Sequence, residues 1–221
     1  MRVLLAVFSK DLVTEWRSRD RIVAMGVFSL LVVVIFHFAL PDGTGRDVRS
    51  NTPGLLWVAY VFSALLGLGR SFAQEQENDA LSGLALAPAE RGWVFLGKAL
   101  ANFVLIAVVQ VMTTAAFALV FDVDLGDVAL QLAAITALGT LGICSAGTLI
   151  AAMAVRTRFG EILMPILLLP TLIPILVAAV GGTEDILATA AIPFDALQLL
   201  VVVDVIYLIT SFLCFEYVLE E

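Results

Sequence analysis

Hydrophobic residues along this chain gather in six long runs that carry almost no charge. A helix needs about 20 mostly apolar residues to cross the hydrocarbon of a bilayer, and each run approaches or exceeds that length. The runs predict membrane-spanning helices at about residues 22–40, 53–69, 94–121, 128–155, 162–180 and 196–215. The pattern therefore predicts an all-α integral membrane protein with a single transmembrane domain over residues 1–221.

The first 21 residues form an amphipathic segment instead of a seventh run. At 100° per residue, four apolar residues share one face of a helix, namely Leu5, Phe8, Leu12 and Trp16. Four polar residues share the opposite face, namely Lys10, Thr14, Arg17 and Arg21. Such a helix is expected to lie in the membrane interface, with its cations toward lipid phosphates. This helix serves either as a membrane anchor or as an element that transmits the motion of a partner.

Lysine and arginine are distributed unevenly between the two sides of the predicted bundle. Ten of the twelve lie in the N-terminal segment or in the second and fourth connections, and only Arg46 and Arg49 lie on the other side. Positive charge is retained on the cytoplasmic side of a membrane, so both termini are predicted to be cytoplasmic. The acidic excess behind the net charge of -8 lies mostly in the outer connections, and such a chain does not suit nucleic acid.

The composition agrees with a membrane protein and excludes several kinds of chemistry. Apolar residues make up 61% of the chain and charged residues 14%, against about 45–50% and about 25% in soluble domains. Cys144 and Cys214 lie inside apolar runs without the spacing of a metal site or a disulfide scaffold, so we interpret them as buried side chains. No hydrolase or protease motif is present, which predicts a non-catalytic membrane subunit.

One near match to a nucleotide-binding loop can be dismissed. Gly92, Gly97 and Lys98 have the required spacing, but the next residue, Ala99, has no hydroxyl group for magnesium, and the loop interior is bulky. We interpret Lys98 as an interfacial cation at the start of the third span. If ATP is used, another subunit must bind it.

Three polar side chains within the spans are candidates for a functional role, because burying them in a membrane is costly. Asp204 lies near the middle of the last span and must face the bundle, a partner or a water-filled cavity. It serves either as a structural hydrogen-bonding group, for example with Gln110, or in a substrate or proton pathway. His37, near the outer end of the first span, is either a haem or proton ligand or a solvated interfacial side chain.

Small residues and prolines indicate how the helices pack. Gly139, Gly142 and Ala146 fall on one face of the fourth span, where small side chains let helices approach closely. The fifth span contains three prolines, Pro165, Pro170 and Pro174, which predict a kink or a re-entrant arrangement. We expect the outer half of this span to be bent.

The connection at residues 70–92 has the most specific pattern in the chain. An acidic cluster precedes a Gly-Leu-x-Leu-x-Pro sequence at residues 83–88, and Gly97 and Lys98 follow at the next span. This order resembles the permease subunits of ABC-2 type exporters and, more closely, the haem exporter protein B (CcmB) family. The resemblance covers nearly the whole chain.

The resemblance implies an ABC-2 type permease in the bacterial cytoplasmic (inner) membrane. It also implies partners: an ABC ATPase subunit that binds ATP, haem-handling membrane subunits, a haem chaperone and a second permease copy. No cofactor is expected in this chain, and haem would be handled by the complex. In such permeases the connection between the second and third spans packs onto the ATPase. The residues expected at that contact are Arg70, Glu75, Glu77, Asn78, Asp79, Leu81 and Leu84.

The leading hypothesis is therefore a permease subunit whose partner hydrolyses ATP to drive haem delivery or haem-chaperone release in cytochrome c maturation. The alternative is a subunit of another ABC-2 type exporter, for lipid, drug or polysaccharide. A proton-coupled carrier that uses Asp204 and a scaffold without energy coupling are further hypotheses.

Overall fold

The helices of the computed structural model account for every predicted span. The structure describes residues 2–39, 45–77, 91–123, 125–155, 157 and 159–218, and no strand occurs among them. The helices are α1 (Arg2–Ser18), α2 (Asp20–Ala39), α3 (Gly45–Glu77), α5 (Arg91–Phe121), α6 (Ala129–Val155), α7 (Gly160–Thr189) and α8 (Phe194–Val218). All but α1 contain a segment long and apolar enough to cross a membrane. The prediction of an all-α membrane protein with six spans is confirmed.

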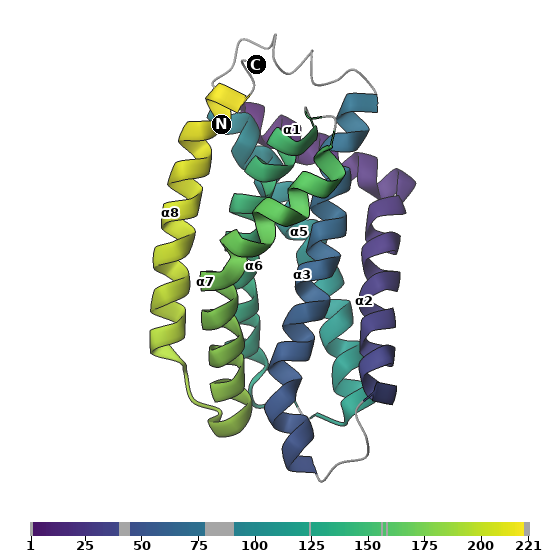
Figure 1. The fold of residues 1–221 in the computed structure, drawn as a ribbon, viewed down its shortest axis with the longest axis vertical. Coiled ribbons are helices and arrows are strands. Elements are labelled where there is room, and N and C mark those ends of the chain that lie inside the picture. Colours follow the sequence, from purple (N-terminus) through teal and green to yellow (C-terminus); the bar gives the residue numbers. More distant parts are fainter. Residues whose placement is uncertain are drawn as a thin grey trace.

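Helix α1 lies across one end of the bundle, the end at which α8 finishes (Figure 1). It meets α2 at Arg19, whose φ of 58° is left-handed, so the chain turns sharply between the two helices. The hydrogen bond from the Arg19 N–H to the Glu15 carbonyl, at 2.7 Å, closes the last turn of α1. Leu5 and Trp16 are exposed, as expected for an interfacial helix, whereas Val7 and Glu15 face the bundle. We refer to this side of the molecule as the α1 end.

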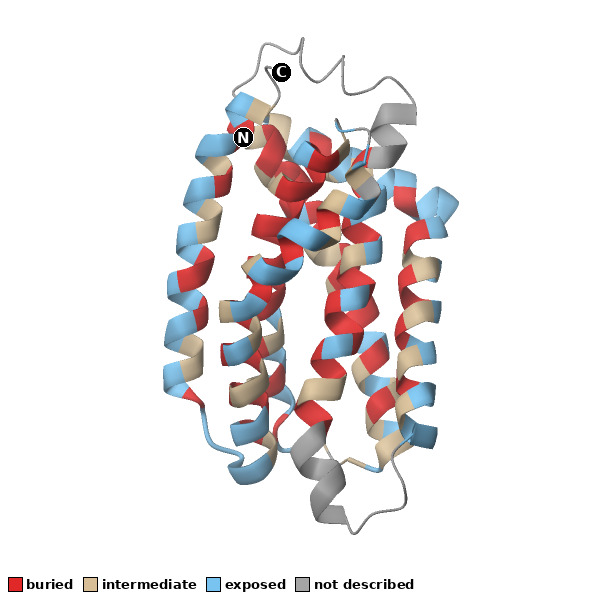
Figure 2. Cartoon of the chain, in the orientation of Figure 1, coloured by how far each residue is buried: buried red, intermediate tan, exposed pale blue. Residues whose placement is uncertain are grey.

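Helix α6 lies at the centre of the packing, and its small residues explain why. Buried positions concentrate on the inner helices, whereas much of α2 and α8 is exposed (Figure 2). Gly139, Gly142 and Ala146 are all buried on α6. A Cβ atom at Gly139 would lie 2.4 Å from the indole of Trp57 on α3, and one at Gly142 would lie 2.6 Å from Ile175 on α7. Larger side chains at these glycines would push the neighbouring helices apart.

Helix α7 is longer than the sequence suggested and contains all three prolines. It continues to Thr189 instead of ending near residue 180, and it stops where Ala190 adopts a left-handed conformation. The prediction ended early because it stopped short of Glu184 and Asp185, which lie exposed in the last turns of α7. Figure 1 shows the half nearer the α1 end running obliquely across the bundle and the other half running along it. The helix is continuous between the two ends, so it is not re-entrant, and its oblique half is the one nearer the α1 end.

Candidate functional site

Lys98, near the start of α5, is almost completely buried, and its interpretation as an interfacial cation is wrong. Its Nζ atom donates a hydrogen bond to Asp11 Oδ2 of α1 at 3.1 Å. The same atom lies 4.5 Å from the centre of the Phe72 ring on α3, close enough for a cation–π interaction. A buried ammonium group needs a counter-charge, and Asp11 provides it. Lys98 therefore connects the start of α5 with the end of α3 and the middle of α1.

Arg21 forms a second buried ion pair at the start of α2. Its Nε atom donates to Glu15 Oε2 at 3.2 Å, and both side chains are nearly inaccessible. Glu15 Oε1 accepts the backbone N–H groups of Arg21 and Ile22 at 3.0 and 2.9 Å. These N–H groups have no partner within the first turn of α2, and a carboxylate is favourable at that end of a helix dipole. The expectation that Arg21 points toward lipid phosphates is wrong, because Glu15 neutralises it inside the bundle.

Asn102 connects the second pair to the central helix. Arg21 Nη1 donates to Asn102 Oδ1 at 3.2 Å, and Asn102 Nδ2 donates to Thr148 Oγ1 on α6 at 3.1 Å. We call the following six residues the charged network: Asp11, Glu15, Arg21, Lys98, Asn102 and Thr148. It joins α1, α2, α5 and α6, and its two carboxylates balance its two cations. Removing one partner from a buried ion pair typically costs about 3–5 kcal/mol, because the other charge is then left buried and unpaired.

The charged network lies beside the predicted ATPase contact. Helix α3 ends at Glu77 and α5 begins at Arg91, and Phe72 and Lys98 are in contact close to those two ends. Arg70 is exposed on α3, and Glu75 and Glu77 belong to its last turns, although their side chains lie outside the described part of the chain. The remaining predicted contact residues also fall outside the described ranges, namely Asn78, Asp79, Leu81 and Leu84.

The polar residues in the middle of the spans are arranged differently. Asp204 is only 2% exposed, and neither of its carboxyl oxygens has a hydrogen-bond partner. It packs against Gly142, where a Cβ atom would lie 2.5 Å from Asp204 Oδ1. Gln110 accepts a hydrogen bond from Thr140 Oγ1 at 2.7 Å, and its Nε2 atom has no partner. The suggested hydrogen bond between Asp204 and Gln110 is therefore not formed.

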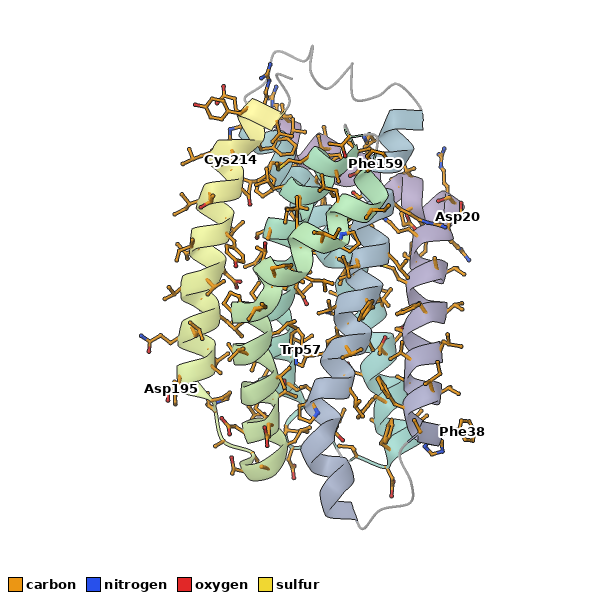
Figure 3. All side chains as sticks on the ribbon, viewed as in Figure 1. Asp20, Phe38, Trp57, Phe159, Asp195 and Cys214 are labelled. Carbon is orange, nitrogen blue, oxygen red and sulfur yellow. The ribbon has the colours of Figure 1, made fainter. Side chains whose placement is uncertain are left out.

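His37 lies at the end of the bundle opposite α1, next to the labelled Phe38 (Figure 3). It is exposed and packs edge-on against the rings of Phe38 and Phe121, at centroid distances of 5.4 and 5.8 Å. Within the described ranges, no three His, Cys, Asp or Glu residues gather in a way that could hold a metal ion. Cys144 is buried and Cys214 is exposed, and both are free thiols, so Cys214 differs from the interpretation made from sequence.

Comparison with known proteins places this arrangement in a family. The family model described as CcmB protein matches residues 2–217. The chain belongs to the CcmB family. A protein named heme exporter protein B from Paracoccus denitrificans is 32% identical over 176 residues, covering 78% of each chain. Another protein of that name, from Bradyrhizobium diazoefficiens, is 28% identical over 190 residues, covering 85% of this chain and 83% of its own. The family match begins in α1 and ends in α8, so it includes the whole charged network.

Within this CcmB-family chain, the role of two residues escaped the sequence analysis. Asp11 and Glu15 contribute to the family resemblance, but neither was expected to pair with a buried cation, although they are four residues apart and therefore lie on one face of α1. The available signal was two carboxylates on one face of an interfacial helix, together with basic residues near the starts of α2 and α5, namely Arg21 and Lys98. The hydrophobic pattern of α1 did not reveal this signal, because hydrophobicity alone does not show which face of the helix meets lipid and which meets protein.

Proposed function

We propose that this chain is the permease-type membrane subunit of an ABC transporter that serves haem export in cytochrome c maturation, with ATP hydrolysed by a partner subunit. Support comes from membership of the CcmB family and from relatives named heme exporter protein B. Six apolar helices give the chain the form of a transporter membrane subunit.

The main support for a role in coupling ATP hydrolysis to movement is that Lys98 contacts residues of two other helices. Its Nζ atom touches Phe72 at the end of α3 and Asp11 in the middle of α1. Helices α3 and α5 flank the segment that we propose as the ATPase contact, and Lys98 joins α1 to them. A partner that pushes on residues 70–92 would displace the end of α3 and the start of α5 together. Asp11 then passes the displacement to α1, and the link through Asn102 passes it to α6.

We place the α1 end on the cytoplasmic face of the inner membrane, with both termini on that side. The excess of Lys and Arg in the connections assigned to this end supports the orientation. An ATPase that binds at residues 70–92 would then have access to cytoplasmic ATP. The partners in this proposal are haem-handling membrane subunits, a haem chaperone on the outer side, and a second permease copy. Haem would be held by that complex, and the movement would serve haem delivery or release of the chaperone.

The proposal is tested by purifying the full chain with its partners from its native membrane in mild detergent. We expect an ATPase subunit and haem-handling membrane proteins to co-purify, together with ATPase activity and a haem absorption band. An ATPase without haem proteins would favour another exporter cargo, and the absence of any ATPase would refute the permease function.

A double substitution tests the ATPase contact directly. The double substitution Glu75→Lys with Glu77→Lys would place two positive charges against the partner surface that binds the two carboxylates in this proposal. Like charges would then face each other. We expect weaker co-purification of the ATPase and reduced ATP-dependent cytochrome c maturation. The control is Glu184→Lys with Asp185→Lys, which reverses two exposed acids at the far end of α7. Equal maturation in the two double variants would exclude the Glu75 and Glu77 carboxylates from the contact.

A further inference from the structure

A groove of about 820 Å³ opens on the side of the bundle at the α1 end. Helices α3 and α7 form its walls, and α6 contributes Ala151 and Ala154. Among the residues that the structure describes, its lining side chains are apolar apart from Arg70 and Thr157. Ligand pockets commonly enclose about 300–1,000 Å³, so the groove is large enough for a small molecule or a lipid chain. Neither the charged network nor Asp204 lines it.

The oblique half of α7 creates this space. Pro165 and Gly160 line the groove on α7, and Gly69 faces them from α3. A Cβ atom at Gly69 would lie 3.4 Å from the sulfur of Met164, so a larger residue there would reduce the opening. Phe159 marks the groove's position near the α1 end, at a height close to that of Asp20 (Figure 3). It is 70% exposed.

The groove has a charged residue at one end and apolar side chains along the rest of its length. This order matches the headgroup and acyl chain of a lipid. Arg70 lies at the α1 end of the α3 wall, and Leu66 and Phe62 follow toward the middle of the bundle. From Arg70 to Phe62 the helix rises about 12 Å. One leaflet of hydrocarbon is about 15 Å thick, so the apolar wall covers most of the depth of a single leaflet. Leu66 and Phe62 are 42% and 43% exposed, so this wall of the groove is open at the surface of the chain.

Arg70 is suited to an anionic headgroup. It is exposed, and among the described side chains no carboxylate lies within ion-pair distance of it. A guanidinium group binds phosphate through paired hydrogen bonds. The lining is less suited to a porphyrin, because Met164 is the one described lining residue of a type that ligates haem iron, and its sulfur would lie 3.4 Å from a Cβ atom at Gly69.

We propose that this groove binds one phospholipid of the leaflet at the α1 end, with the phosphate on Arg70 and an acyl chain along Leu66 and Phe62. The assignment gives Arg70 a role apart from the ATPase contact suggested by its sequence position. It does not depend on the proposed function, because lipid retention is measured without ATP or haem.

Native mass spectrometry of the full chain tests the proposal, with phosphatidylglycerol added to the detergent micelles. We expect the chain to keep one lipid at a detergent concentration that removes the others. Arg70→Gln should weaken that binding about tenfold, since a charge-assisted hydrogen bond is lost. Arg17→Gln, which removes an exposed cation from α1, is the matched control and should keep the lipid. Equal loss in the two variants, or no retained lipid in the unsubstituted chain, would overturn the assignment.

A tryptophan reporter gives a second measurement that does not depend on Arg70. Leu66→Trp places the reporter in the groove, and Val205→Trp places it on the lipid-exposed face of α8. After brominated phospholipid is added and then diluted with detergent, quenching should persist at position 66 and disappear at position 205. Loss at both positions would refute a retained lipid. Displacement of the brominated lipid by added haem would refute a dedicated phospholipid site.

Discussion

The α1 end and the middle of the bundle bury ionisable groups in opposite ways. At the α1 end, Lys98 and Arg21 each meet a carboxylate at 3.1 and 3.2 Å. In the middle, Asp204 is as deeply buried but has no hydrogen-bond partner on either oxygen. The first region is a set of matched charges that connects four helices. The second is a single carboxyl group enclosed by Gly142 and its neighbours.

This difference indicates what each region can contribute. A buried ion pair is expensive to break from one side, so the charged network holds α1, α2, α5 and α6 together where it joins them. A buried carboxyl group without a partner is costly as a carboxylate. Asp204 therefore adds little to the linkage between helices, and its removal should disturb the bundle far less than removal of Arg21.

The largest effect is expected from Arg21→Met. This substitution leaves the buried Glu15 carboxylate without its cation and should lower the free energy of unfolding by about 3–5 kcal/mol. Unfolding by SDS titration from mild detergent measures the change. Arg17→Met, at an exposed position of α1, serves as the control and should change stability by less than about 0.5 kcal/mol.

Adding Glu15→Gln to Arg21→Met distinguishes the loss of a counter-charge from the loss of packing. The double variant should recover part of the lost stability, because no unpaired charge remains buried. A double variant less stable than Arg21→Met alone would show that the pair does not act as matched charges.

A moderate effect is expected in the middle of the bundle from Gly142→Ala. The new methyl group would lie 2.5 Å from Asp204 Oδ1 and 2.6 Å from Ile175, and overpacking of this kind typically costs about 1–3 kcal/mol. Gly181→Ala on α7 is the matched control, because its Cβ atom would meet nothing within 4 Å. SDS titration compares the stability of the two variants. Equal stability would show that α6, α7 and α8 move apart easily around Gly142.

A smaller change in stability is expected when the first pair is replaced by neutral groups. Asp11→Asn with Lys98→Gln retains polar side chains of similar size and should cost about 1 kcal/mol. If matched charges transmit motion, cytochrome c maturation should fall while the ATPase still co-purifies. Maturation at the unsubstituted level would limit the Lys98 contact to a structural role.

The smallest effect is expected from Asp204→Asn. The two side chains have nearly the same shape and no hydrogen bond is lost, so stability should change by less than about 1 kcal/mol. Maturation should also be retained, which complementation of a strain lacking this chain would measure. Loss of maturation at normal stability would instead support the proton pathway considered from the sequence.

Particular residues show how far the sequence could predict the site. The order of charges and glycines at 70–92 identified the family, because that pattern is local in the chain. The position of Asp204 in an apolar run already required burial. Glu15 is only six residues from Arg21, but the contacts of Lys98 with Asp11 and of Arg21 with Asn102 could not be predicted, because these residues are 87 and 81 positions apart.

What the sequence determined by itself is the set of six spans, since a bilayer of fixed thickness requires long apolar runs to form helices with internal hydrogen bonds. Tertiary structure alone decided which polar groups meet. Helix period brings Asp11 and Glu15 to one face of α1, but only packing of α1 against α2 and α5 gives those carboxylates their cations. Packing of α8 against α6 leaves Asp204 without a hydrogen-bond partner, because Gly142 brings the bare backbone of α6 against it.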